Sequence, residues 1–423
     1  MKNFKLRKIL IISPHFPPSN LAAVHRSRLF AQHLQSFGWK PIVLAVHEKY
    51  YEEILDWNLS KLVDSNLQIE KVSAFKVTKP RIIGDIGLRA FFQLRKKALN
   101  LIKTEGIDFI YIPIPSFYVS LLGNYLFKQT GVKFGIDYID PWVHTFPGSE
   151  KVFSRHWFST TMAKILEPIA LKNVSLITGV AEGYYKGVQQ RNPSLLKTCI
   201  FGAMPYGGEE LDHLSLKGLN LAPYLFKADS NKLVIVYAGA LLPKAYEPLR
   251  QIFSAIRENQ EKFKDVQFHF IGTGKSSNAE NSYNVKFLAE EFNLWETIVF
   301  EYPKRIPYLD VLVHLSVADA VFILGSTEPH YTPSKTYQAV LCKKPIIAVL
   351  HKQSTAVEAL RSTKAGIVLS FNGENDIKNL KINFKIFFAE SLTFIKSYNS
   401  GLVDLKVFEK YSAFNILKNW FHW

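Results

Sequence analysis

The sequence predicts an α/β protein made of two successive halves, each with a mostly parallel sheet. Three observations lead to this prediction. Short apolar runs of strand character alternate with segments whose apolar residues recur at helical spacing. The alternation stops in a turn-rich stretch at 204–231 and restarts at residue 233. The chain has 423 residues, of which 48% are hydrophobic, so it can bury two separate cores.

Charge and cysteine usage narrow the classes of function. The formal net charge of +16 favours anionic partners such as nucleotide phosphates, phospholipid headgroups or nucleic acid. We expect no nucleic acid, because the basic residues are scattered rather than interleaved with aromatic stacking residues. Cys199 and Cys342 lack paired spacing, so we expect no disulfide and no structural metal, which fits a reducing compartment. The apolar run 8–13 is too short for a signal peptide or membrane span.

In the first half, the ends of two expected strands carry candidate site residues. The expected strands are 8–13, 41–46, 109–114, 133–139 and 175–180, and the expected helices are 22–37, 88–103, 117–129, 159–172 and one from residue 182. Arg26 and Arg28 lie in the first turns of the first helix, and Asp140 and His144 follow the fourth strand. Open α/β sheets bind ligands at the carboxyl ends of their strands. The alternatives are that the arginines are solvated surface charges and that Asp140 caps a turn.

The segment 88–103 has two open interpretations. Its apolar residues form a broad set, while Arg89, Lys96 and Lys103 recur at heptad spacing on another face. A basic amphipathic helix of this kind can lie on an anionic membrane. More often such a helix packs on a sheet with its lysines in water.

The second half repeats the alternation and contains a candidate anion site. The expected strands are 233–238, 266–271, 298–302, 320–324 and 346–350, and the expected helices are 246–259, 308–316 and one that Pro333 opens. If Thr332 is the N-cap, the backbone N–H groups of Ser334 and Lys335 lie unpaired at the positive end of the helix dipole. An ordinary capped helix is the alternative. Gly272 begins a Gly-Thr-Gly-Lys turn that lacks full phosphate-loop spacing and is weak evidence by itself.

Several segments together resemble one known family. They include ISPHFPPSNLAAVHRSRLF, GIDYIDPWV, LITGVAEGYY, VYAGALLPKAYEPL, FHFIGTGK and TPSKTYQAVLCKKPIIAVL, in that order along the chain. The chain resembles the GT-B-fold retaining glycosyltransferases of the large bacterial polysaccharide and lipid-glycan group, similar to glycosyltransferase family 4. The resemblance implies two Rossmann-like, doubly wound domains facing across a cleft: an acceptor-side domain at 1–215 and a nucleotide-sugar domain at 232–395. It also implies that a helical segment at 396–423 returns to the first domain.

The resemblance also implies the site residues. The implied donor-binding residues are Gly239, Lys244, Gly272, Glu328, His330, Ser334, Lys335 and Gln338, and the implied catalytic residues are Asp140, Arg26 and His144. Members of this family have two glutamates at the helix that corresponds to the one Pro333 opens here. Here Gln338 replaces the second, and His330, or Glu328 after a loop adjustment, stands at the first. Ala240 replaces an arginine that is common after the first strand of the second domain, and Lys244 remains nearby.

The expected function is transfer of a sugar from a nucleotide diphosphate sugar to a glycan or lipid-linked acceptor, with retention. Positive side chains would stabilise the leaving diphosphate, so we expect neither a metal nor another cofactor. We expect a cytoplasmic protein, with an anionic membrane at the inner face as a further candidate partner. Two alternatives remain open: a sugar-nucleotide epimerase or hydrolase of similar fold, and a nucleotide-sugar-binding protein with weakened catalysis.

Overall fold

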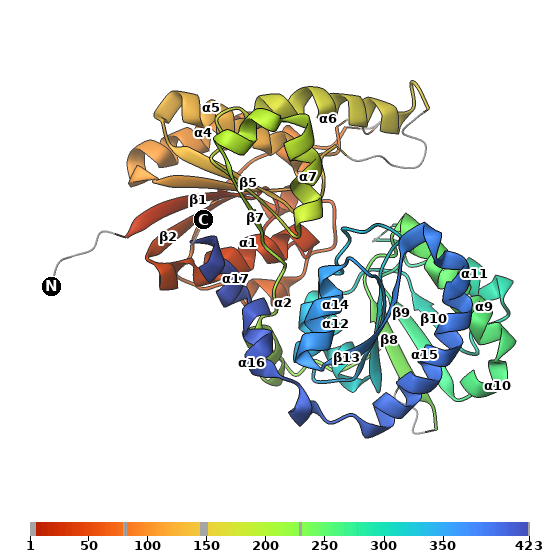
Figure 1. The fold of residues 1–423 in the computed structure, drawn as a ribbon. Coiled ribbons are helices and arrows are strands. Elements are labelled where there is room, and N and C mark those ends of the chain that lie inside the picture. The colour runs from red at the N-terminus through yellow and green to blue at the C-terminus, as the bar shows by residue number, and fades with distance from the viewer. Residues whose placement is uncertain are drawn as a thin grey trace. The chain divides into compact units, whose positions relative to one another are not determined.

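The structure is a computed structural model that describes residues 6–78, 81, 83–143, 151–227, 231–276 and 278–421. The chain divides into two compact units. One comprises Met1–Tyr206 together with Ile416–Trp423, and the other comprises Gly207–Asn415. Each unit is an α/β layer structure (Figure 1). Within the described residues, no helix is both long and apolar enough to cross a membrane.

The first unit is built on a sheet of seven parallel strands in the order β3-β2-β1-β4-β5-β6-β7. The strands are β1 (Arg7–Ile12), β2 (Trp39–Val46), β3 (Gln68–Val72), β4 (Phe109–Ile114), β5 (Lys133–Tyr138), β6 (Leu176–Gly179) and β7 (Ile200–Ala203). Its helices are α1 (Ala22–His33), α2 (Trp57–Ser60), α3 (Ile86–Arg89), α4 (Phe91–Leu101), α5 (Ser120–Thr130), α6 (Arg155–Leu171) and α7 (Glu182–Arg191). The sequence predicted five of these strands and missed β3 and β7.

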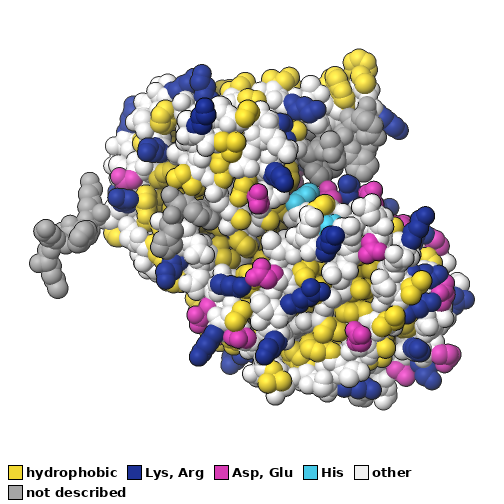
Figure 2. Space-filling view, viewed as in Figure 1, with side chains coloured by type: hydrophobic (Ala, Val, Ile, Leu, Met, Phe, Trp, Pro, Cys, Tyr) yellow, Lys and Arg dark blue, Asp and Glu magenta, His cyan; other side chains and the backbone are white. Residues whose placement is uncertain are grey.

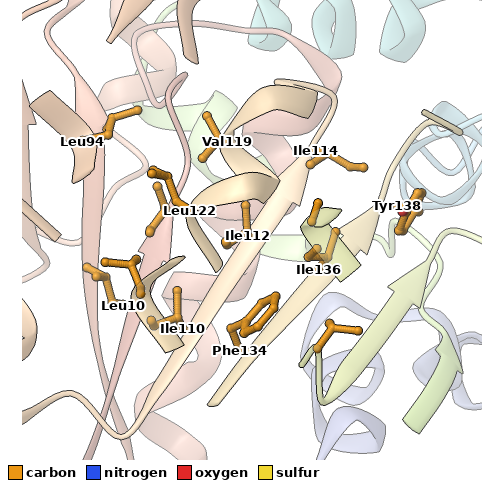
Figure 3. Close-up of a cluster of buried hydrophobic side chains, with 14 of the residues drawn as sticks. Leu10, Leu94, Ile110, Ile112, Ile114, Val119, Leu122, Phe134, Ile136 and Tyr138 are labelled. Atoms are coloured by element: carbon orange, nitrogen blue, oxygen red, sulfur yellow. The ribbon is translucent and has the colours of Figure 1, made fainter. Parts of the chain in front are cut away.

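Both faces of the first sheet are covered, because successive side chains of each strand point to opposite sides. Leu10 of β1 lies in a core cluster with side chains of β4, β5, α4 and α5 (Figure 3). Its neighbours Ile9 and Ile11 lie in a second cluster on the other face, with Phe30 of α1. Trp420 of α17 (Ala413–Trp420) completes that second cluster. The C-terminal helix therefore returns to the first unit, as expected.

The second unit is built on six parallel strands in the order β10-β9-β8-β11-β12-β13. The strands are β8 (Leu233–Ala238), β9 (Val266–Ile271), β10 (Val299–Tyr302), β11 (Ala320–Leu324), β12 (Ile346–His351) and β13 (Gly366–Phe371). The helices are α8 (Glu210–Ser215), α9 (Tyr246–Glu258), α10 (Gln260–Phe263), α11 (Lys286–Glu291), α12 (Tyr308–Val317), α13 (Lys335–Leu341), α14 (Thr355–Thr363), α15 (Ile377–Ser397) and α16 (Leu405–Phe408). The two Rossmann-like sheets confirm the predicted α/β class.

The helix expected at 88–103 is a core helix. It forms as α3 and α4, and Leu94, Ala98 and Leu101 of α4 are buried in the first unit. Arg89, expected on a solvent face, is itself buried and donates hydrogen bonds to the carbonyl oxygens of Phe75 and Tyr50. Of the large apolar residues in this segment, only Phe92 is exposed. The packing interpretation therefore describes this helix better than the membrane interpretation.

Candidate functional site

In the second unit, two glycines follow neighbouring strands at one edge of the sheet. Gly239 follows β8 with φ +145°, and Gly272 follows β9 with φ +71°. Their N–H groups donate to the carbonyl oxygens of Ile271 and Tyr302, at 2.9 and 2.8 Å. These donors are therefore used inside the sheet. What the two glycines provide is a left-handed backbone without a Cβ, which lets other groups approach closely.

Two basic residues lie beside these glycines. The Lys335 Cε atom is 4.0 Å from the point where a Cβ on Gly239 would lie, and the Arg305 Cα atom is 3.8 Å from the corresponding point on Gly272. Burial and the positive charge of Arg305 lower the pKa of Lys335 to about 8. No carboxylate among the described residues forms an ion pair with Lys335. A cation held near another cation, without an acidic partner, is a site that an anion would stabilise.

The sequence missed Arg305. It lies in the loop that follows β10, directly after Pro303 and Lys304. The sequence did contain a signal for Arg305. Two basic residues closely follow a strand, and the carboxyl ends of such strands form the ligand-binding edge of the sheet.

The helix after β11 begins later than expected. α13 starts at Lys335, and its N-cap residue is Ser334, whose side chain makes no capping hydrogen bond. The expectation that Thr332 caps this helix is wrong: its Oγ1 atom is buried, 2.9 Å from Oγ1 of Thr355. No backbone hydrogen bond in the described part of the chain uses the N–H groups of Ser334 and Lys335. The N–H groups therefore remain open although the cap residue differs.

The side chain of Gln338 is hydrogen-bonded to a histidine. Its Oε1 atom lies 2.9 Å from Nε2 of His213 on α8. Burial lowers the pKa of His213, so the imidazole is neutral and donates its Nε2–H to that oxygen. The free end of Gln338 is then its NH2 group, which donates hydrogen bonds. The sequence did not single out His213, because nothing in its spacing connects it to Gln338.

The other donor-side residues lie on loops. The Lys244 side chain is exposed, and its carbonyl oxygen accepts a hydrogen bond from the N–H of Thr327 at 3.0 Å. Glu328 and His330 are half-buried in the loop between β11 and α13, and the Glu328 N–H donates to Oγ of Ser326. The loops that carry these three residues therefore lie at the same sheet edge as Lys335.

In the first unit, Asp140 follows β5 and is exposed. It makes no hydrogen bond to any residue in the described ranges, so the turn-cap alternative has no support there. Crowding by surrounding atoms removes part of its hydration and raises its pKa to about 6. Because the side chain keeps contact with solvent, we regard this desolvation as partial. His144 lies outside the described residues.

Arg26 is neither a surface charge nor turned outward. It is 3% exposed, and its Nε atom is 3.0 Å from the Asp137 carboxylate. Its terminal nitrogens donate to the carbonyl oxygens of Met204 and Pro205, and its guanidinium stacks over the Tyr206 ring. The alternative that the arginines are solvated surface charges is therefore wrong for Arg26. It is also wrong for Arg28, which is 2% exposed.

The first unit also contains an acid–histidine pair that the sequence did not reveal. Nδ1 of His15, in the loop after β1, is 2.8 Å from the Glu53 carboxylate, which also accepts a hydrogen bond from Ser19. Burial by itself would raise the pKa of Glu53, but the hydrogen bonds and the charge of His15 outweigh it and hold the pKa at about 2. Residues 38 positions apart meet here because β1 and β2 are adjacent and parallel.

Comparison with known proteins is informative at the level of structure. No family model matches the chain, and no curated protein matches it in sequence. The sucrose-phosphate synthase of Thermosynechococcus elongatus has a TM-score of 0.64 at 13% identity, over 98% of both chains. HepE of Anabaena, in complex with UDP and glucose, has a TM-score of 0.61 at 15% identity, again over 98% of both chains. The trehalose-6-phosphate synthase OtsA has a TM-score of 0.63 at 11% identity with the same coverage. At such identities the likeness establishes the fold, and the chain has the two-domain GT-B fold.

Proposed function

We propose that the chain is a glycosyltransferase that moves a sugar from a nucleoside diphosphate sugar to a glycan or lipid-linked acceptor. The observation that carries this proposal is the proximity of Lys335 and Arg305 beside two glycines with positive φ. A diphosphate fits both features, because it supplies negative charge to the cations and approaches the backbone where Cβ atoms are missing. HepE, a structural relative, has been solved with UDP-glucose, which supports this donor class.

The reaction breaks the bond between the anomeric carbon and the diphosphate oxygen and forms a bond to an acceptor hydroxyl oxygen. Negative charge develops on the departing phosphate, so fixed positive charge beside it lowers the barrier. Lys335 and Arg305 supply this charge, together with the open N–H groups of Ser334 and Lys335. Lys244 adds a flexible cation. In this proposal the protein needs no metal ion, and chelation by EDTA should leave the rate unchanged.

The remaining donor contacts fall to residues of α13 and the loop before it. The NH2 group of Gln338 can donate to a ribose or sugar hydroxyl, because His213 occupies its oxygen. Glu328 and His330 can accept hydrogen bonds from hydroxyls. A glutamine here gives a weaker contact than the glutamate of the resembled family, since its hydrogen bond is not charge-assisted.

On the acceptor side we assign Asp140 to the acceptor hydroxyl or the transferred sugar. Because its pKa is about 6, the Asp140 carboxylate is mostly ionised at pH 7 and can still accept a proton from the acceptor hydroxyl. Retention of the anomeric configuration, a cytoplasmic location and association with the inner face of a membrane complete the proposal. The sequence resemblance supports retention, the cysteine usage fits a reducing compartment such as the cytoplasm, and the positive net charge supports membrane association.

The test is a calorimetric screen of UDP, GDP, ADP and CMP sugars against the wild-type chain, Lys335→Gln and Lys262→Gln. Lys262 is an exposed lysine of α10 and serves as the matched control. We expect one nucleoside diphosphate class to bind, and only Lys335→Gln to weaken it. Equal affinities in all three proteins would refute the anion site. Consumption of the donor without an acceptor would instead indicate an epimerase or hydrolase.

A further inference from the structure

An apolar stripe runs along the exposed side of α6, the long helix beside α5 (Figure 1). Phe158, Met162, Ile165 and Ile169 are each at least 43% exposed. Their spacings of four, three and four residues place them on one side of the helix. Val152 and Phe153, just before the helix, are also exposed. Figure 2 shows apolar side chains gathered at the edge of the first unit near this helix.

The opposite side of α6 is firmly attached to the first unit. Ala163 and Ala170 lie in its core, and Glu167 is buried in a bidentate ion pair with Arg191, at 2.8 and 2.9 Å. Asn124 of α5 donates a hydrogen bond to the carbonyl oxygen of Ile169 at 3.0 Å. The helix therefore has a satisfied inner face, so the exposed stripe is an additional apolar surface.

Among the described side chains between positions 151 and 173, the exposed charged residues are all basic. Lys151, Lys164 and Lys172 are exposed, as is His156. Glu167 is the only acidic residue between positions 151 and 173, and it is buried against Arg191. An exposed apolar stripe flanked by lysines, without an exposed carboxylate, has the composition of a helix that lies in an anionic lipid interface.

Aromatic residues mark one end of the surface. The ring of Trp157 is 5.7 Å from that of Phe153 and 5.1 Å from that of Phe158. Ser154 fixes this end of α6, because its Oγ atom accepts the N–H of Trp157 at 3.0 Å. Tryptophan is enriched at membrane–water interfaces, where its ring is partly in the apolar region and its N–H reaches water.

We infer that this stripe on α6 is the surface by which the chain docks on an anionic bilayer. The inference rests on the membrane association proposed above, and it does not depend on sugar transfer. A second copy of the chain suits the surface less well. A symmetric contact would bring the lysines of one copy toward those of the other, and the described segment 151–173 offers no exposed carboxylate to pair with them. Anionic headgroups supply the missing negative charge, and the acyl region takes up the apolar side chains.

The experiment uses vesicle sedimentation to compare the wild-type chain with a triple variant on α6 and a double variant on α15. Phe158→Gln, Ile165→Gln and Ile169→Gln together remove the stripe while keeping good helix formers. Ile382→Gln and Ile386→Gln on α15 form the matched control, since those isoleucines are 60 and 61% exposed. The vesicles are pure phosphatidylcholine, or phosphatidylcholine with about one third phosphatidylglycerol. Circular dichroism checks that each variant is folded.

We expect the wild type and the α15 variant to bind the anionic vesicles and to dissociate at high salt, because the attraction is screened. The α6 variant should bind at least about tenfold more weakly, since three apolar side chains no longer enter the interface. Equal binding by the α6 variant would overturn the inference, as would failure of the wild type to bind anionic vesicles. Self-association that the α6 variant abolishes, without vesicle binding, would assign the stripe to a second copy. Donor calorimetry on the same variants should be unchanged, which separates this test from that of the sugar-transfer proposal.

Discussion

Arg26 on α1 of the first unit and Lys335 on α13 of the second unit are in opposite electrostatic situations. In the first unit, Arg26 is surrounded by a carboxylate and two carbonyl oxygens, so its charge is fully compensated within the fold. In the second unit, Lys335 is partly buried, and burial and the positive charge of Arg305 lower its pKa. A compensated charge stabilises structure and gains little from a ligand. A cation held near another cation gains directly when an anion arrives.

The largest expected effect concerns Arg26, whose charge is compensated within the fold. Arg26→Met should lower the free energy of unfolding by ~3–5 kcal/mol, because it leaves Asp137 charged and 0% exposed without its partner. Urea unfolding measures this loss, and calorimetry on the folded variant should show unchanged donor affinity. The double variant Arg26→Met with Asp137→Leu should recover much of the stability. If Arg26→Met instead keeps its stability but loses transfer, the catalytic role implied by the family resemblance is correct.

The next effect concerns Lys335, which forms no ion pair with a described carboxylate. Lys335→Gln should weaken nucleoside diphosphate sugar binding by ~1.5–3 kcal/mol, the range for a hydrogen bond to a charged group. Its free energy of unfolding should fall little or rise, because the substitution removes the repulsion from Arg305. Arg305→Gln should act in the same direction. A large loss of stability with unchanged donor affinity would show that Lys335 is structural, like Arg26.

A smaller effect concerns the exposed carboxylate of the first unit. Asp140→Asn should leave donor affinity within about threefold, under ~0.7 kcal/mol. Transfer should fall at least tenfold, about 1.4 kcal/mol in the barrier. In the wild type, transfer should decline as the pH falls through about 6, where Asp140 becomes protonated. Loss of stability without a separate effect on turnover would make Asp140 a structural residue and move attention to His144.

The smallest expected effect is the pH dependence of donor binding. The pKa of Lys335 is about 8 in the folded protein, against an ordinary value of 10.5. Folding therefore disfavours its charged form, so its contribution to stability rises as the pH increases from about 8 to 10.5. Donor affinity should change in the opposite sense, falling about fourfold between pH 7 and 8.5 as the lysine loses its proton. The Lys335→Arg variant should bind the donor equally at both pH values. If its donor affinity instead falls with pH as in the wild type, Lys335 is not the group that causes the pH dependence.

The sequence was sufficient for the central strands of both sheets and insufficient for three edge strands. The last four residues of β1 and all of β12 are buried, and both stretches are mostly continuous apolar runs in the sequence. The strands that the sequence missed, β3, β7 and β13, each lie at a sheet edge and are largely half-buried or exposed. Edge strands contact a neighbour on one side only, so their composition is less constrained.

For the candidate site, the sequence by itself determined which strand ends and which helix carry polar and basic residues. Lys335 was predicted from the expected start of a helix and Gly272 from a glycine turn after a strand, whereas Gly239 was implied by the family resemblance. Only the tertiary structure decided which charges are compensated. Arg305 approaches Lys335 and His213 approaches Gln338 across many intervening residues, while Arg26 turns into the fold toward Asp137. The direction of a side chain and the identity of its partner depend on packing between distant segments, and local periodicity does not encode that packing.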